Sequence, residues 1–484
     1  MLFALLLLPP LVSSVLPAVV RRHGRALGWV NVAGASLSLA ASAGLSASVV
    51  TGADAPAAPG ALLAADALSA LLAVCIALVT LLAVALGPGL ADDDPHDATA
   101  VRRYRIFLNA LALTMLVAVT TTSVALMWVA IEATTIASAI IIPLERTKAS
   151  VEASWKYLLI CSVGIALAFA GTVLAYFDFV STTGPLPSAL DWTVLRAAAP
   201  ALRPELMRLA FAFILVGYGT KAGLAPMHTW LPDAHSEAPA PLSAMMSGVL
   251  LAVAMYAIAR WKSVVDASLG PSFTNTLLMT AGLLSVVIGT FSLVIQRHYK
   301  RMLAYSSVEH IGLATIGLAL GPIGVFAAFL HLVNHAVAKS MAFLLAGRVL
   351  ERYRTSEIAG VSGLLRAMPW TGGLFGVAVL TLVGLPPFGL FLSEFLLVRA
   401  AVVTGQFFVA GAVLALLVVA FASLLNHLNH MLYGQVPDGV AVGERRGWPT
   451  VTLAGCAGLL VMLGVVLPWP VTALLDRAVS VLTP

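Results

Sequence analysis

Residues 221–241 read KAGLAPMHTWLPDAHSEAPAP and carry the strongest structural signal in this chain. Lys221 lies inside an apolar run, and Pro226 interrupts the helix that this run predicts. A lysine at membrane depth is costly, so such residues usually face the interior of a helix bundle and mark ion or proton routes. Interrupted helices are the usual means of placing polar groups at mid-membrane. The alternative is a lysine near a helix end whose ammonium group reaches the membrane surface.

Composition predicts a polytopic α-helical membrane protein, because 60% of the 484 residues are hydrophobic and only 10% are charged. The three cysteines (Cys75, Cys161 and Cys456) lie in apolar runs without CxxC spacing. They support neither an iron–sulfur cluster nor a disulfide framework, so we expect no cofactor in this chain. The net charge of +5 comes from loop arginines and does not indicate a nucleic-acid surface.

Apolar stretches of about 18 or more residues predict fourteen membrane spans. Their expected limits are 2–20, 26–50, 61–87, 104–122, 124–143, 153–178, 205–226, 239–260, 272–295, 302–320, 322–349, 368–402, 405–432 and 450–475.

The lysines and arginines favour one orientation of these spans. With the N-terminus outside, cytoplasmic segments hold 18 of the 27 basic residues, outer segments hold 7, and Lys221 and Lys339 lie within spans. Because cytoplasmic loops are enriched in basic residues, this split places both termini outside the cytoplasm. The N-terminus has no basic residue ahead of its apolar stretch, so we expect a retained first helix rather than a cleaved signal peptide. We expect a multi-pass protein of the cell inner (plasma) membrane.

The span at 368–402 is also interrupted, by GLPPFG at 384–389. Two broken spans five positions apart predict two five-helix units, 104–262 and 272–432, with inverted topology. Three N-terminal helices (1–103) and one C-terminal helix (450–475) complete the expected organisation.

Two ionisable residues in the first unit are natural partners. Glu132 lies in an apolar stretch, where an unpaired carboxylate would be very costly. Lys221 is its natural partner, and a Lys–Glu pair in low dielectric can have strongly shifted and coupled proton affinities, which a proton relay needs.

The second unit carries a row of ionisable residues. His331, His335 and Lys339 recur at i, i+4 and i+8, which places them on one helical face. Glu309 and His310 lie about two turns into the preceding span. Because histidine exchanges protons near neutral pH, this row is typical of a proton wire.

Other interpretations of these groups remain open. His331 and His335 could bind zinc, although neither an HExxH acid nor a suitable third ligand is apparent, and we expect no metal. The row could also serve only to hold helices together. Further polar groups form an accessory path in the prediction; they are His228, Asp233, His235, Glu237, Glu309 and His427.

Several motifs together resemble one superfamily over about residues 60–430. They are KAGLAPMHTWLPDAHSEAPAPLSA from Lys221, DALSALL from Asp66, KRMLAYSS from Lys300, LPPFGLFLSEF from Leu385, Glu132 and the histidine row. The chain is similar to the antiporter-like proton-channel subunits of respiratory complex I, Mrp-type sodium/proton antiporters and group 4 hydrogenases. Within that superfamily it most resembles component F of the hydrogenase-4 and formate hydrogenlyase type.

The resemblance implies roles for matching residues. Glu132 would modulate the proton affinity of Lys221, a relay would follow through His310, His331, His335 and Lys339, and Glu394 would be its terminal group. The sequence departs from several relatives because the span at 239–260 has no lysine or histidine before Arg260. The link between the units would then need waters, Ser247 or His310.

Two functions follow as expectations. In the first, the chain is a proton-translocating subunit of a multisubunit oxidoreductase, with iron–sulfur, metal or quinone sites in partner subunits and a peripheral redox arm. In the second, it belongs to an Mrp-type cation/proton antiporter or an ion-driven inorganic-carbon uptake system. Gene neighbours would separate the two. An inert scaffold is disfavoured by the intact set of ionisable residues.

Overall fold

The structure, a computed structural model, describes residues 1–20, 24–52, 61–90, 96–186, 188–444 and 447–483. The basic residues Arg21, Arg22, Arg445 and Arg446, which we assign to the cytoplasm, lie outside the described residues. Within the described part the secondary structure is helical, and only isolated β-bridges join its loops.

The helices of the N-terminal region and first unit are α1 (Leu2–Val19), α2 (Arg25–Thr51), α3 (Ala67–Ala85), α4 (Ala98–Thr120), α5 (Val124–Ile141), α6 (Lys148–Thr183), α7 (Trp192–Ala198), α8 (Pro204–Ala222), α9 (Trp230–Glu237), α10 (Ala240–Met245) and α11 (Leu251–Leu269). The helices that follow are α12 (Ser272–Val294), α13 (Tyr299–Leu318), α14 (Gly321–Tyr353), α15 (Leu364–Ala367), α16 (Pro369–Leu382), α17 (Gly389–Val403), α18 (Phe407–Leu432), α19 (Trp448–Val465) and α20 (Trp469–Leu482). Short 3-10 turns and one π turn (Met246–Leu250) lie between them.

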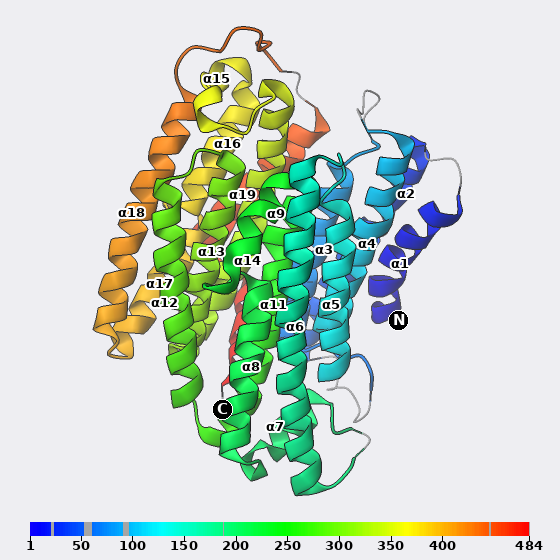
Figure 1. The fold of residues 1–484 in the computed structure, drawn as a ribbon, viewed down its shortest axis with the longest axis vertical. Coiled ribbons are helices and arrows are strands. Elements are labelled where there is room, and N and C mark those ends of the chain that lie inside the picture. Colours follow the sequence, from blue (N-terminus) through cyan, green and yellow to red (C-terminus); the bar gives the residue numbers. More distant parts are fainter. Residues whose placement is uncertain (21–23, 53–60, 91–95, 187, 445–446, 484) are drawn as a thin grey trace.

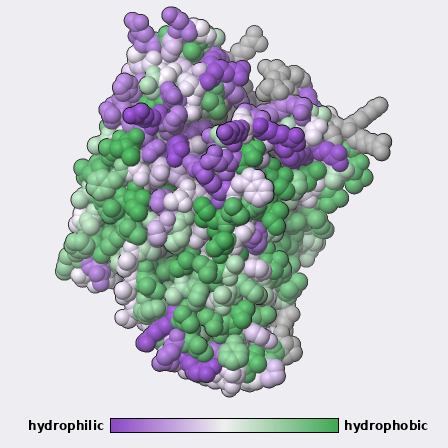
Figure 2. All heavy atoms as spheres, in the orientation of Figure 1, coloured by the Kyte–Doolittle hydropathy of each residue, from purple (hydrophilic) through white to green (hydrophobic). Residues whose placement is uncertain are grey.

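The helices form an elongated bundle whose long axis they largely follow (Figure 1). In this view α1 and α2 lie at one edge, α17 and α18 lie at the other, and α8, α11 and α14 lie between them. Hydrophobic residues form a broad band around the middle, and hydrophilic residues gather at both ends (Figure 2). That distribution is the one expected of a polytopic membrane protein.

Twelve described segments are long and apolar enough to cross a membrane, so the predicted number of fourteen is not confirmed. Two predicted spans account for the difference. Helix α13 carries Lys300, Arg301 and Glu309, which lower its hydropathy. The predicted span at 368–402 is divided into α16 and α17, which have 14 and 15 residues.

Both predicted helix breaks are present. After α8, Gly223 adopts φ 75°, and its N–H donates to the carbonyl oxygens of Gly219 and Thr220. The indole nitrogen of Trp230, at the start of α9, donates to the Thr220 carbonyl at 2.8 Å. After α16, Gly384 adopts φ 66°, and the chain becomes helical again at Gly389. Glycine permits the left-handed backbone that ends each first segment.

The loops lie at the two ends of the bundle, and they divide between these ends as the predicted cytoplasmic and outer segments do. At one end, Arg103 donates to the carbonyl oxygens of Pro143 and Leu144, and a β-bridge joins His298 to Glu357. At the other end, the N–H of Val124 donates to the carbonyl oxygen of Leu190. Which end faces the cytoplasm stays a prediction from the charge distribution.

Two predicted spans have wrong limits. The single helix expected at 450–475 is two helices, because the chain leaves helical conformation at Val466 and Pro468 precedes α20. The span expected at 239–260 continues to Leu269. Arg260, which we assign to an outer loop, therefore lies within a helix, where Asp66 compensates its charge.

Candidate functional site

Lys221 lies in the last turn of α8, directly before the break, and is completely buried. Its ammonium nitrogen donates to the Thr135 hydroxyl at 2.8 Å and to the Tyr157 hydroxyl at 2.7 Å. The Tyr157 ring centroid lies 4.8 Å from the same nitrogen. The site therefore holds a cation with neutral hydroxyl groups from α5 and α6.

The predicted partners Glu132 and Lys221 do not contact each other directly. Its carboxylate accepts hydrogen bonds from Ser162 at 2.6 Å and from Thr135 at 3.3 Å. Because Thr135 lies one turn after Glu132 on the same face of α5, its hydroxyl stands between the carboxylate and the ammonium group. The carboxylate and the ammonium group are therefore joined through a bridging hydroxyl.

Sequence reasoning missed the hydroxyl groups that build this site. Tyr157 also shares a 2.7 Å hydrogen bond with Ser138, one turn beyond Thr135. The spacing of Glu132, Thr135 and Ser138 at three-residue intervals in an apolar segment is a signal that could have indicated a polar face.

The second site joins α13, α14 and α17. The Nδ1 atom of His310 lies 3.0 Å from Nε2 of His331, and Nδ1 of His331 lies 3.0 Å from the Ser393 hydroxyl. The His310 ring centroid lies 5.0 Å from that of His331 and 5.4 Å from that of His335. Three of the predicted relay residues are thus in one buried cluster.

Glu394 enters this cluster from the second broken helix. Its carboxylate packs on Gly384, where a Cβ atom would lie 2.0 Å from Oε2. Gly384 is therefore required both for its positive φ and for the space that it leaves. The Oε1 atom of Glu394 is buried and makes no hydrogen bond to the described residues.

Lys339 belongs to the same helical row but turns toward the start of α13. Its ammonium nitrogen donates to the Leu303 carbonyl oxygen at 2.8 Å and to the Ser306 hydroxyl. Its charge interacts with that of Glu309, which is also buried. The predicted row therefore has a histidine end near Glu394 and a lysine end near Glu309.

His235 lies between the two sites. Its ring is 6.0 Å from that of Trp230, which lies 4.9 Å from the Tyr157 ring of the Lys221 site. On the other side its ring lies 5.7 Å from that of Phe343 on α14, the helix that carries His335 and Lys339. Both of its ring nitrogens are buried and lack hydrogen-bond partners among the described residues.

Helices pack closely around the π turn at Met246–Leu250, in the span that has no lysine or histidine before Arg260. Ser247 lies in the π turn and shares a 2.8 Å hydrogen bond with Ser307. A Cβ atom on Gly248 would lie 2.6 Å from the Ser340 hydroxyl and 3.0 Å from the Ala336 carbonyl oxygen. Gly248 thus approaches α14 between His335 and Lys339 and leaves no room for a long side chain.

The other accessory residues lie apart from this cluster. Asp233 forms ion pairs with Lys156 at 3.4 Å and Arg301 at 3.1 Å, and Glu237 is exposed. His228 is half-buried, with its ring 6.3 Å from that of Tyr305. His427 lies 3.1 Å from the Leu293 carbonyl oxygen.

A third potential metal ligand, absent from the sequence interpretation, comes from the fold. Ligand atoms of His310, His331 and Glu394 lie within 4.8 Å of one another. The acid was not apparent in the sequence because it lies 63 residues from His331 (394 − 331). The 3.0 Å separation of the facing imidazole nitrogens is that of a hydrogen bond, so the geometry suits proton sharing.

A polytopic helical bundle with buried ionisable residues beside two interrupted helices is typical of ion-translocating membrane proteins. The chain belongs to the family described as NADH:quinone oxidoreductase/Mrp antiporter, TM, which matches residues 121–419. Every predicted relay residue lies in the matched part. The predicted family is thereby confirmed.

Individual relatives agree with this membership. The chain is 39% identical over 337 residues to a hydrogenase-4 component F homolog from Methylacidiphilum infernorum, covering 69% of this chain and 71% of the relative. It is 28% identical over 310 residues to a Na(+)/H(+) antiporter subunit from Alkalihalophilus pseudofirmus, covering 64% and 61%. A chain of the membrane-bound sulfane sulfur reductase, an archaeal respiratory membrane complex, superposes with a TM-score of 0.87 at 26% identity, covering 99% and 96%.

Proposed function

We propose that this chain is the proton-translocating membrane subunit of a multisubunit oxidoreductase of the inner membrane. Lys221 with Glu132 forms its first proton site, and His310, His331, His335, Lys339 and Glu394 form its second. The observation that carries the proposal is His235, a buried imidazole whose ring lies beside Trp230 on one side and Phe343 of α14 on the other. Without it the two sites would be separate polar clusters.

The chemistry of this route follows from the contacts. Lys221 can lose its proton when the influence of Glu132 weakens, because a buried ammonium group without a nearby anion is destabilised. Thr135 and Tyr157 remain to hydrogen-bond the neutral amine. An imidazole can accept a proton at one nitrogen and release one from the other, which suits His235, His331 and His310 for transfer.

Partner subunits would supply the driving reaction. The relatives named for hydrogenase and respiratory complexes support an assembly with redox centres in other chains. The similarity to a sodium/proton antiporter chain supports the alternative, exchange of a cation for protons without redox chemistry. Mass spectrometry of the chains that co-purify with a tagged copy separates the two, because hydrogenase-like subunits support the first and small antiporter subunits the second.

Reconstitution tests the proposal itself. The complex containing Lys221→Ala should retain its subunits but translocate protons at least about tenfold more slowly, since one proton-binding group is removed from the path. Lys262→Ala, at a lysine near the end of α11, is the matched control and should leave transport unchanged. Unchanged transport in the Lys221→Ala complex would contradict the proposed function.

A further inference from the structure

A buried serine in the second broken helix contacts one histidine of the proposed route. Ser393 lies on α17, directly before Glu394, and is completely buried. Its hydroxyl oxygen lies 3.0 Å from Nδ1 of His331 and 2.8 Å from the Leu390 carbonyl oxygen. The proposed route gives roles to His331 and Glu394 but none to this hydroxyl group.

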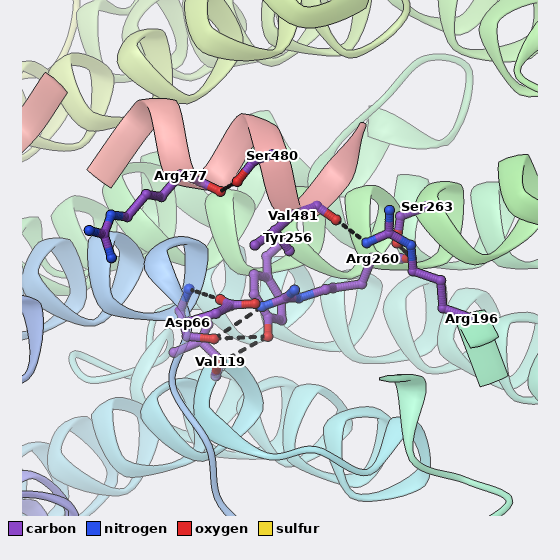
Figure 3. A network of polar contacts seen from close by, with 10 residues as sticks. Asp66, Val119, Arg196, Tyr256, Arg260, Ser263, Arg477, Ser480 and Val481 are labelled. Atoms are coloured by element: carbon purple, nitrogen blue, oxygen red, sulfur yellow. Dashed lines mark hydrogen bonds and ion pairs between the residues drawn. The ribbon is translucent and has the colours of Figure 1, made fainter. Parts of the chain in front are cut away.

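The contact with Leu390 uses the only hydrogen of the Ser393 hydroxyl. A carbonyl oxygen can only accept, so Ser393 must be the donor to Leu390. Helical serines often donate to a carbonyl three residues earlier, as Ser480 does to Arg477 at 2.7 Å (Figure 3). The contact between Ser393 and His331 is then a hydrogen bond only if Nδ1 of His331 carries a hydrogen and donates it.

This tautomer of His331 decides the arrangement of the next contact. A neutral imidazole carries a hydrogen on one nitrogen only, so Nε2 of His331 presents a lone pair. That lone pair faces Nδ1 of His310 at 3.0 Å, and His310 must therefore donate through Nδ1. The opposite tautomer of His331 would leave Ser393 with one hydrogen for two acceptors, and one of its two contacts would lose its hydrogen bond.

One nitrogen of the neutral histidine pair is left to take up a proton. With its hydrogen on Nδ1, His310 has a bare Nε2 atom, which is buried and makes no hydrogen bond to the described residues. Glu394 lies in the same buried cluster, and its Oε1 atom also lacks a partner there. A nearby carboxylate stabilises a protonated imidazole, so the cluster can hold the added charge.

We propose that Ser393 is a positioning residue that keeps the hydrogen of His331 on Nδ1, so that a proton enters the pair at Nε2 of His310. When that nitrogen gains a proton, Nδ1 of His310 can pass its own hydrogen to Nε2 of His331. One N–H bond breaks as the other forms, and the positive charge moves from His310 to His331. Ser393 carries no proton itself, because its hydrogen stays on the Leu390 carbonyl oxygen. The inference rests on the proposed function, because it takes this pair as part of the route.

Solid-state NMR of the complex tests the tautomer without measuring transport. Histidine labelled with ¹⁵N at Nδ1 or at Nε2 is incorporated, and the signal that is lost in the His331→Gln complex belongs to His331. We expect a hydrogen on Nδ1 of His331 and none on Nε2. The Ser393→Ala complex should divide this signal between the two tautomers, whereas Ser393→Thr keeps a hydroxyl group and should preserve it. A bare Nδ1 atom in the unchanged complex, or the same tautomer in Ser393→Ala, would overturn the inference.

Driven proton uptake tests the consequence for the route. Ser393→Ala should slow uptake about threefold to tenfold, because losing one hydrogen bond lets part of the complexes adopt the opposite tautomer. Ser393→Thr should stay within about twofold of the unchanged complex, and a loss as large as that of Ser393→Ala would contradict the role of the hydroxyl group as acceptor.

The matched control is Ser263 on α11. It is also buried and donates to the carbonyl three residues earlier, that of Arg260, at 2.8 Å. Ser263→Ala removes the same kind of helical hydrogen bond away from the histidines, so uptake should be unchanged. Equal slowing by Ser263→Ala and Ser393→Ala would reduce the effect to helix stability and overturn the positioning role.

The failure of this inference can be told apart from the failure of the proposed function. The Lys221→Ala complex should lose driven transport but keep the hydrogen of His331 on Nδ1. Normal transport in that complex contradicts the proposed function, whatever the tautomer. A tautomer that changes in Ser393→Ala while uptake stays normal would confirm the contact but overturn its role in proton entry.

Discussion

The two broken helices carry their ionisable groups in different ways. At the first break, one ammonium group is held by two hydroxyl groups, and Glu132 reaches it only through Thr135. At the second break, imidazole groups contact each other directly, and Glu394 fits against Gly384 inside the break. We therefore propose that the first site changes the proton affinity of a single residue, whereas the second passes protons among several.

The largest expected effect lies at the lysine end of the second site. Lys339→Arg keeps the positive charge but cannot release a proton, so driven translocation should fall at least about tenfold. Lys339→Ala should lower driven translocation by a similar factor, while the complex still assembles. Proton uptake by reconstituted complexes measures both, with the surface substitution Lys156→Arg as control. Normal transport by Lys339→Arg would make this lysine a structural charge and remove it from the path.

Replacing the bridging hydroxyl of the first site should have the next largest effect. Thr135→Val keeps the shape of the side chain but disconnects Glu132 from Lys221, so transport should slow about threefold to tenfold. Thr135→Ser retains a hydroxyl group and is the control. Glu132→Gln should slow transport to a similar degree, and combining it with Thr135→Val should add little, because both break one connection. Fully additive losses would show that Thr135 does not mediate between the two charges.

The glycine in the second break should be sensitive to a single methyl group. Gly384→Ala would place a Cβ atom 2.0 Å from the Glu394 carboxylate and strain a backbone with φ 66°. We expect it to destabilise the complex by about 1–3 kcal/mol and to lower transport. Gly405→Ala has a similar φ of 73° but open space around it, so it isolates the cost of the backbone. Equal melting temperatures and equal transport for the two variants would contradict the fitted position of Glu394.

Much of this site could be predicted from the sequence, because its strongest features each lie within one helix. The breaks after Lys221 and before Glu394, and the spacing of His331, His335 and Lys339, need only local periodicity and Pro/Gly chemistry. The proposed role of His235 as the link rests on the packing of α9 against α6 and on the contact of His235 with Phe343 of α14, which no local pattern contains. Arg260 was wrongly assigned to an outer loop for a related reason. A prediction from hydropathy ends the span at this arginine, because its ion-pair partner Asp66 lies far away in the sequence.

The smallest effect on activity is expected from cysteine labels that test the orientation of the whole bundle. Leu186→Cys, at a side chain 47% exposed in the segment predicted to lie outside, should react with an impermeant maleimide in intact cells. Gly434→Cys, at the opposite end, should react only after permeabilisation. The reverse labelling pattern would invert the assignment of both ends while leaving the comparison of the two breaks unchanged.

Whether the two sites form one path is tested most directly by a double-mutant cycle. Driven proton uptake is measured for complexes containing Lys221→Ala, Lys339→Ala and both substitutions. A single route through His235 predicts that the double variant is no slower than the slower single variant, because either change already interrupts it. Two independent routes would instead leave substantial transport in each single variant and remove it only in the double variant, and that result would contradict the connected path.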